Sequence, residues 1–541
     1  MARWQRVIAA SACALLLATG CTSPTSGPHS EPPDAPATGA TSADLEFVGT
    51  PQPATPDQIA AAAARARAGT DTRPNVVIVM TDDMRTDELA WMPITRSLIG
   101  RPGMEFTHAI SAHPLCCPAR AQILTGQYAQ NNGVRHNGGR WGGYPALNAS
   151  STIATDLHAA GYATGFLGKH LNTYRGHTVP DPGWSWFKPI NRGEFTYDRF
   201  RFFGETPYRD AYVTDTLNGY ATTMITDLAG TGRPFVAIIN QVAPHSKRVG
   251  KHRQVAPPAP ARHRDLFAHT VNPAEADPAF NEADISDLPA PYRDARPRDV
   301  ERTRHWFRAR IRSLQAVDEG VAQLVDRLEE LGELDNTYLV FTSDNGYALG
   351  EHRMWSKDKL IAPVLSIPLL VRGPGIAGGS TSSRITTLAD LSATILHLAD
   401  APTDRVLDGE PAFGPGRRRG PDARWRDTTL VLTGSARESG ANPGWGWRGV
   451  QTWRYLFVRS AQHRDDVYLF DRRLDPHEMT NVAEDPRYRQ VRLELAGRLR
   501  ELISCAGPAC NQRFGPVTAP RLGPGGGHRK PGRIEARNPQ R

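Results

Sequence analysis

Short runs of apolar, mostly β-branched residues recur through the middle of the chain, and they predict strands that are buried on both faces. The first run, Asn-Val-Val-Ile-Val-Met at 75–80, is followed by Phe-Val-Ala-Ile-Ile at 235–239 and by Thr-Tyr-Leu-Val-Phe-Thr at 337–342. Shorter runs predict two more strands at 162–167 and 367–371. Unbroken apolar strands of this kind are typical of parallel sheets.

Between these runs, apolar residues repeat at helical spacing. Leu217, Tyr220, Met224 and Leu228 share one face of a predicted helix at 212–228. Further patterns predict a long amphipathic helix at 307–331 and shorter helices at 151–160 and 390–398. The alternation predicts an α/β fold in which helices flank a large, mixed but mostly parallel sheet. Residues 246–299 lack such a pattern, and we expect them to form a long surface excursion near the site.

The pattern changes after a loop at 403–427. Three short strands are predicted close together at 429–433, 455–459 and 466–470, and a helix at 488–503 follows them. This change predicts a smaller C-terminal α+β subdomain at 428–510, beside a main domain at 73–402.

The two ends of the chain have the composition of unfolded segments. Residues 21–72 are rich in Pro, Ala, Thr and Ser, which predicts a flexible tether, with a short helix at 59–68. Residues 511–541 predict a basic disordered tail. Residues 1–20 have a positive start and an apolar run that predict a signal peptide, and the Ala-Thr-Gly-Cys that ends at Cys21 resembles the lipid-attachment motif of bacterial lipoproteins. Ordinary secretory cleavage is the alternative, and a lipid anchor is the only membrane attachment we expect.

Charge and cysteine content narrow the function. The net charge of the 541 residues is +8, but the tail alone holds seven Lys or Arg residues against one Glu. The folded body therefore has no strongly basic face, which argues against nucleic-acid binding. Two of the six cysteines, Cys505 and Cys510, are predicted to pair in a disulfide outside the cytoplasm.

Polar residues follow several of the predicted strands, directly or within a few residues. Asp82 and Asp83 follow the strand at 75–80, and Lys169 and His170 follow the strand at 162–167. His245 comes after the strand at 235–239, and Asp344 and Asn345 come after the strand at 337–342. Because ligands bind at the carboxyl ends of parallel strands, we expect these side chains to converge. Three carboxylates and an amide oxygen suit Ca²⁺, with Mg²⁺ as the alternative, and do not suit a zinc site.

The most distinctive stretch is Cys-Cys-Pro-Ala-Arg at 116–120. Pro118 fits the first position of a helix, so Cys116 is predicted to lie at or just before a helix N-terminus, where backbone amides favour an anion. Arg120 can reach the same anion. From these residues alone, a structural cysteine pair remains an equal alternative.

With its acidic partners at 82–83 and 344–345, this stretch resembles the Cys-X-Pro-(Ser/Ala)-Arg signature of the type I sulfatases, of the alkaline phosphatase superfamily. The resemblance covers about 74–510. Gly-Lys-X-Leu-Asn at 168–172, Ala-Pro-His-Ser at 243–246 and Ser-Asp-Asn-Gly-Tyr at 343–347 resemble the branch that includes N-acetylglucosamine-6-sulfatases and extracellular heparan sulfatases.

The resemblance implies a sulfuric ester hydrolase that acts on a sulfated sugar. A formylglycine-generating enzyme would oxidise Cys116 to formylglycine, whose hydrated form attacks sulfur, while Cys117 is the variable position. The implied metal ligands are Asp82, Asp83, Asp344, Asn345 and the modified Cys116, and the implied catalytic residues are Arg120, Lys169, His245 and Lys357. His170 and Asn172 are candidate substrate-binding residues.

Two positions depart from the family pattern. Many sulfatases have a histidine where this chain has Leu171, so the base of the elimination step is not identified. A Tyr-Glu pair that usually follows the lysine is replaced by Ile361 and Ala362. Two rival functions stay open: a phosphatase or phosphonate monoester hydrolase of the same superfamily, and an inactive surface binder of sulfated glycans with an unmodified cysteine.

Overall fold

A computed structural model of the protein describes residues 55–175, 179–206, 208–250, 253–415 and 425–521. The predicted signal peptide, Cys21 and most of the basic tail lie outside these residues. Among the described residues, no helix has the length and apolar character needed to cross a bilayer.

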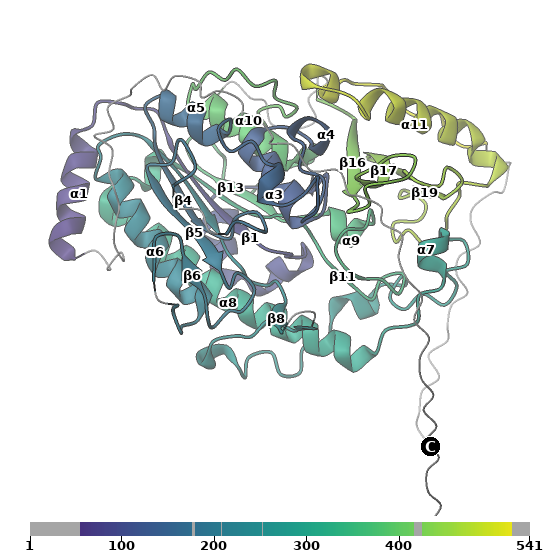
Figure 1. The fold of residues 1–541 in the computed structure, drawn as a ribbon, viewed down its shortest axis with the longest axis horizontal. Helices are drawn as coiled ribbons and strands as arrows, with labels where there is room; N and C mark the ends of the chain where they lie inside the picture. Colours follow the sequence, from purple (N-terminus) through teal and green to yellow (C-terminus); the bar gives the residue numbers. More distant parts are fainter. Residues whose placement is uncertain (1–54, 176–178, 207, 251–252, 416–424, 522–541) are drawn as a thin grey trace, which may run out of the picture. The chain divides into compact units, whose positions relative to one another are not determined.

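A nine-stranded mixed sheet forms the centre of the fold, with the strand order β14-β2-β13-β10-β1-β7-β4-β5-β6 (Figure 1). The strands from β10 to β5 are parallel to one another, whereas β13 and β6 run antiparallel to their neighbours β10 and β5. The bounds are β1 Asn75–Thr81, β2 Met104–Phe106, β4 Ala163–Gly168, β5 Trp186–Arg192, β6 Arg201–Phe202, β7 Phe235–Asn240, β10 Thr337–Ser343, β13 Leu369–Arg372 and β14 Ser380–Ser382. The predicted mixed, mostly parallel sheet is confirmed.

Helices cover both faces of this sheet, and β1 explains why. Its residues alternate between two apolar clusters: Val77 and Val79 belong to one, Val76 and Ile78 to the other. Both clusters are buried, so the middle of β1, residues 76–80, is apolar on both faces. The first face is covered by α1 Pro56–Ala68, α6 Val213–Ala229 and α8 Val300–Leu331, and the second by α3 Cys116–Thr125, α5 Ile153–Ala159 and α10 Leu388–Leu398.

Helix α1 corrects the prediction of a tether that reaches residue 72. The short helix predicted inside the tether forms, but it starts at Pro56 and packs against α6 and α8 with Ala62 and Ala63 buried. Thr55 caps it with a reciprocal capping box that includes Gln58. The small side chains of the alanine run allow this close packing, so the folded part of the chain begins well before the expected boundary at residue 73.

A second, four-stranded antiparallel sheet follows, with β16 Thr428–Gly434, β17 Trp445–Thr452, β18 Tyr455–Ser460 and β19 Val467–Asp471 in sequential order. Helix α11 Arg489–Leu502 packs on it. Strand β17 was not predicted, because Gly446, Arg448 and Gly449 interrupt its apolar pattern. The division of the chain at 403–427 stays a prediction, since Tyr128 and Ala129 of the main part share an apolar cluster with this sheet.

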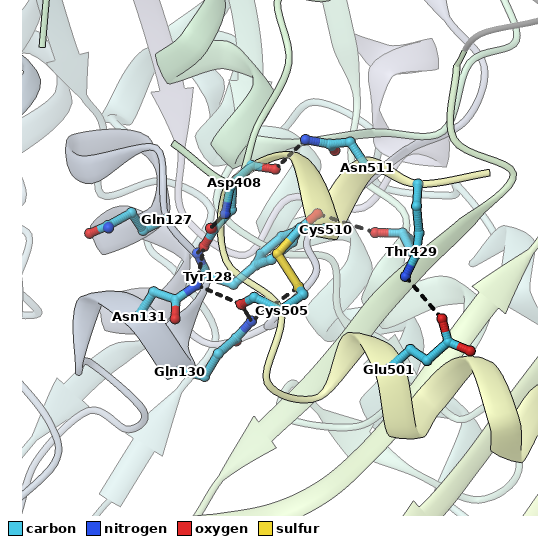
Figure 2. Close-up of a disulfide and its surroundings, with 12 residues drawn as sticks. Gln127, Tyr128, Gln130, Asn131, Asp408, Thr429, Glu501, Cys505, Cys510 and Asn511 are labelled. Atoms are coloured by element: carbon cyan, nitrogen blue, oxygen red, sulfur yellow. Dashed lines mark hydrogen bonds between the residues drawn. A yellow bond between two sulfur atoms is a disulfide. The ribbon is translucent and has the colours of Figure 1, made fainter. Parts of the chain in front are cut away.

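Cys505 and Cys510 form the predicted disulfide just after α11 (Figure 2). The carbonyl of Cys505 accepts hydrogen bonds from Asn131 Nδ2 at 2.9 Å and Gln130 Nε2 at 3.3 Å. Asn131 also donates to Asp408. The disulfide loop is thereby attached to α4 Ala129–Asn132, which directly follows α3.

The described residues of the excursion at 246–299 form only short elements: β8 Lys247–Val249, β9 Arg253–Val255, two 3₁₀ turns and α7 Ala290–Arg293. Several of its residues are buried against α8 or the segment after β10, among them His263 and Glu282. It is therefore attached along much of its length.

Candidate active site

Two pairs of polar residues, which together hold three carboxylates and one amide, meet at the carboxyl ends of β1 and β10. The strands are parallel and in register, with Thr81 opposite Ser343, so Asp82 and Asp83 emerge beside Asp344 and Asn345. All four side chains are at most 1% exposed. The backbone N–H of Asp83 donates to Asp344 Oδ1 at 3.0 Å, and Asn345 Nδ2 donates to Asp83 Oδ1 at 2.8 Å.

This group of oxygens fits a divalent cation. Asn345 Oδ1 is buried and has no hydrogen-bond partner, although buried acceptors are normally satisfied. Three buried carboxylates lie next to it, and their mutual repulsion favours a bound positive charge. Ligand atoms of Asp82, Asp83, Cys116 and His245 lie within 4.8 Å of one another. Carboxylate and amide oxygens are the ligands that Ca²⁺ and Mg²⁺ prefer.

Cys116 is the first residue of α3, as its predicted position at a helix start requires. Pro118 is the third helical residue rather than the first, which the first turn also tolerates because its N–H groups have no partner within the helix. Gly126 ends the helix with a positive φ of 71°. The helix therefore directs Cys116 towards the acidic group.

The sulfur of Cys116 lies among charged groups. Lys357 Nζ is 2.8 Å from Sγ, Lys169 Nζ is 3.2 Å away, and Asp82 Oδ1 is 3.5 Å away. Lys169, at the end of β4, pairs with Asp82, and Lys357 pairs with Asp83 at 2.5 Å. Arg120 binds Asp344 at 2.9 Å. Three buried cations thus balance three buried carboxylates around one sulfur atom.

Burial and charge set the ionisation of this group. Burial opposes ionisation of Asp82, but Lys169, His245, Lys357 and Arg120 outweigh it and hold the carboxyl pKa well below its usual value. Burial also raises the Cys116 pKa to about 11, with Asp82 adding to the effect. The unmodified thiol is therefore protonated at neutral pH and is a poor nucleophile.

Cys117 is a packing residue in this arrangement. Its backbone N–H donates to Asn137 Oδ1 at 2.9 Å, and its sulfur accepts the backbone N–H of Asn172 at 3.1 Å. Burial raises its pKa to about 12. The two neighbouring cysteines are not bonded to each other, so the structure gives no support to a disulfide at 116–117.

His245 faces the acidic group, with Nε2 3.6 Å from Asp83 Oδ2. Its Nδ1 is 2.8 Å from the carbonyl oxygen of Ser246, which can only accept, so Nδ1 carries the proton of the neutral ring. Burial, aided by Lys357, lowers the His245 pKa to about 4. At neutral pH, His245 therefore presents a lone pair to the site rather than a proton.

The two candidate substrate-binding residues differ in their surroundings. His170 is 4% exposed, lies 3.2 Å from Asp181 and stacks on Tyr174, so its ring belongs to an aromatic cluster. Asn172 has a buried side-chain oxygen without a partner, which leaves it able to accept a hydrogen bond. The predicted role of His170 gains no support from these contacts.

Sequence reasoning missed Arg310 of α8. Its guanidinium pairs with buried Glu88 and donates to the backbone carbonyl of Asp83 at 2.5 Å. Arg310 follows Phe307 by three positions and precedes Leu314 by four, so it lies on the buried face of the helix. An arginine on the apolar face of a predicted helix indicates a buried ion pair, and this signal could have identified Arg310.

Comparisons with known proteins identify the family. The family model described as Sulfatase matches residues 74–401, and the model described as N-sulphoglucosamine sulphohydrolase, C-terminal, matches residues 350–504. The chain is 30% identical over 495 residues to the N-acetylglucosamine-6-sulfatase of Homo sapiens, with 81% of this chain and 86% of the relative covered.

Solved structures share the fold. One is a protein in complex with its substrate D-glucosamine-2-N,6-O-disulfate, with a TM-score of 0.62, 24% identity, and 79% of this chain and 97% of the other covered. Another is the phosphonate monoester hydrolase of Agrobacterium radiobacter, with a TM-score of 0.58, 23% identity, and 80% and 96% covered. Together with the family model, which matches more than half of the chain, these findings show that the chain belongs to the sulfatase family of sulfuric ester hydrolases.

Proposed function

We propose that this sulfatase hydrolyses a sulfate monoester of a sulfated sugar, using formylglycine made from Cys116 and a divalent cation, with Ca²⁺ as the first candidate and Mg²⁺ as the alternative. The observation that carries the proposal is the position of the Cys116 sulfur between the ammonium groups of Lys169 and Lys357, beside Asp82. The sugar class is supported by the N-acetylglucosamine-6-sulfatase relative and by the disulfated glucosamine of the structural neighbour.

Formylglycine would supply a hydrated aldehyde, whose hydroxyl is a far better nucleophile than the protonated thiol at this position. The metal ligands would be Asp82, Asp83, Asp344 and Asn345, and the bound cation would supply positive charge against the sulfate. Without a metal ion, the three positive side chains of the site balance its three carboxylates. A divalent ion makes the pocket positive, which suits an anionic ester.

The chain's own cations have separate positions around the sulfur. Lys169 comes from the end of β4 and Lys357 from the segment after β12 Trp355–Ser356, so they approach Cys116 from different elements. We assign Lys169 and Arg120 to the sulfate oxygens. Lys357 would stabilise the leaving oxygen, because its pKa stays high beside Asp83 despite burial. His245 would orient groups or accept a proton at Nε2, since its lowered pKa makes it a poor acid.

The phosphonate hydrolase neighbour supports a second candidate, hydrolysis of a phosphonate or phosphate monoester. The relative rates with 4-nitrophenyl sulfate and 4-nitrophenyl phosphate separate the two. We expect the sulfate ester to be the better substrate by kcat/KM, and the opposite order would favour the second candidate.

We also propose that the chain acts outside the cytoplasm. The signal-like residues 1–20 and the Cys505–Cys510 disulfide support export, because disulfides persist in oxidising compartments. We further propose that Cys21 is lipidated and that a formylglycine-generating enzyme modifies Cys116.

The test is the Cys116→Ala variant. We expect sulfate release to fall by about four orders of magnitude or more, as for loss of a nucleophile, while circular dichroism and thermal unfolding stay close to wild type. Cys117→Ala is the matched control, since it removes the neighbouring sulfur and should retain most activity. Full activity of the Cys116 variant would refute the proposal.

Mass spectrometry of the peptide that contains residue 116 separates the enzyme from an inactive binder. An aldehyde in protein from a host that has the maturation enzyme supports catalysis. An intact thiol there would support the glycan-binding alternative.

A further inference from the structure

Two arginines flank the ring of one tryptophan beside the active site. The guanidinium carbon of Arg135 lies 4.6 Å from the centroid of the Trp445 ring, and that of Arg448 lies 4.8 Å from it. Arg135 belongs to the loop that follows α4, while Trp445 and Arg448 belong to β17. Residues distant in sequence thus form what we name the Arg135–Trp445–Arg448 cluster.

The charges of this cluster have no acidic counterpart among the described residues. Arg135 donates only a long hydrogen bond of 3.5 Å to the carbonyl of Pro443, and Arg448 donates to the side-chain oxygen of Asn442 at 3.1 Å. The Nε atom of each arginine is buried and has no acceptor. Arg459, paired with Arg448 across β17 and β18, adds a third positive charge.

Other buried arginines of the protein show what is missing here. Arg120, Arg310 and Arg426 each bind a buried carboxylate, namely Asp344, Glu88 and Asp390. In the cluster, by contrast, burial together with the neighbouring Arg135 and Arg459 lowers the pKa of Arg448 to about 10. Partly buried like charges without a partner are costly, and a bound anion would remove that cost.

The cluster adjoins the nucleophile position through two short connections. Asn137 accepts the backbone N–H of Cys117 at 2.9 Å, and Arg135 is only two residues away, which limits the Cα separation to about 7 Å. His113, three residues before Cys116, has its ring centroid 6.5 Å from that of Trp445. An anionic group on the same sugar as the scissile sulfate, or on the next sugar, is therefore within range.

We propose that the Arg135–Trp445–Arg448 cluster binds a second sulfate or carboxylate of the substrate, so that the preferred substrate is a sugar with two anionic groups. This inference rests on the proposed function. Arginine suits the role because its planar fork donates paired hydrogen bonds to an oxyanion. Trp445 helps to hold the two guanidinium groups, since both lie within cation–π distance of its ring.

The test compares kcat/KM for glucosamine 6-sulfate and for glucosamine 2-N,6-O-disulfate. A charge-assisted contact predicts that wild-type protein prefers the disulfate by about tenfold or more, mainly through a lower KM. Arg448→Gln and Arg135→Gln should each reduce this preference severalfold, and Arg448→Lys should restore part of it. A 6-sulfated disaccharide with a uronic acid shows whether a carboxylate serves as well as a sulfate.

Arg437→Gln is the matched control. Arg437 is an exposed arginine of the loop before β17, with no contact to the Trp445 ring, so its loss should leave the preference nearly unchanged. An equal kcat/KM for the two sugars in wild-type protein would overturn the inference, and so would a preference that survives both Gln variants. If a Gln variant does not fold, the wild-type ratio still decides.

Calorimetry with the Cys116→Ala protein separates failure of this inference from failure of the proposed function. Tighter binding of the disulfate than of the monosulfate, without turnover by wild-type protein, would support the cluster and refute the catalysis. Turnover by wild-type protein with equal affinities for the two sugars would support the catalysis and refute the role of the cluster.

Discussion

At the scale of single residues, Asn345 best shows how the site differs from a packed core. Its Nδ2 donates to Asp83 Oδ1 and to the carbonyl of Gly346, while its Oδ1 has no partner. An unsatisfied buried acceptor costs about 1–3 kcal/mol unless a ligand satisfies it. A divalent cation would do so and would also relieve the repulsion between Asp82, Asp83 and Asp344.

We therefore expect chelation of divalent ions to abolish activity and added Ca²⁺ to restore it. Asn345→Leu, which has a similar volume but no oxygen, should weaken Ca²⁺ binding by about tenfold or more. Calorimetric titration of chelator-treated protein measures this directly. Asn345→Asp keeps the oxygen ligand and serves as the control, and wild-type affinity in the Leu variant would contradict the assignment.

The motif residues were predictable, whereas their surroundings were not. The sequence around Cys116 marks the proposed nucleophile position because Cys-Cys-Pro-Ala-Arg at 116–120 resembles the family signature. The position of His245 beside Asp83 depends on a neighbour far away in the sequence, and the polar contact of His170 depends on Asp181 in another segment. The same holds for Arg135 and Arg448, whose proximity depends on how β17 lies against the loop after α4.

At the scale of elements, α8 supports the turn after β1 that contains Asp82 and Asp83. Arg310 binds Glu88 and the carbonyl of Asp83, so it links the helix to both ends of the turn after β1. Asp83 has a φ of 72°, in the left-handed region that non-glycine residues seldom adopt. The hydrogen bond from Arg310 helps to hold this conformation.

Arg310→Gln should destabilise the protein by about 3–5 kcal/mol, because Glu88 would stay buried without its partner. Activity should fall as well, since Asp83 loses its support. Denaturant unfolding and sulfate release measure the two effects. Arg308→Gln, a half-buried neighbour that donates only to the carbonyl of Thr270, should cost less than about 1 kcal/mol. Similar losses in both variants would show that the Glu88 pair is unimportant.

Element prediction succeeded where burial on both faces forces an unbroken apolar sequence, as in β1, β7 and β10. It failed for β17, in which Trp445, Val450 and Gln451 are buried but glycines and Arg448 lie between them. It also placed the fold boundary too late, because the alanine run of α1 has the composition of a linker and yet packs closely against α6 and α8.

At the scale of the whole molecule, the loop closed by the Cys505–Cys510 disulfide follows α11 and is hydrogen-bonded to α4, which comes directly after α3. This loop is short, with a separation of five residues, so the loop-closure model predicts a contribution of about 2 kcal/mol. The hydrogen bonds from Gln130 and Asn131 to the Cys505 carbonyl do not need the sulfur atoms.

The Cys505→Ser, Cys510→Ser double variant should therefore lose about 2 kcal/mol in guanidinium unfolding and keep its kcat/KM. Wild-type protein unfolded in the presence of a reductant is the matched comparison and should behave like the variant. Loss of activity in a variant that is still folded would show that the disulfide also fixes the site.

The burial of Cys116 bears on whether its modification can take place before or after folding. Its side chain is only 1% exposed and is enclosed by Lys169, Lys357 and Asp82. In the proposed maturation, an enzyme could not reach this sulfur in the native protein, so oxidation to formylglycine would precede folding. Protein that folds first would be trapped in an inactive form, and only unfolding and a second encounter with that enzyme could rescue it.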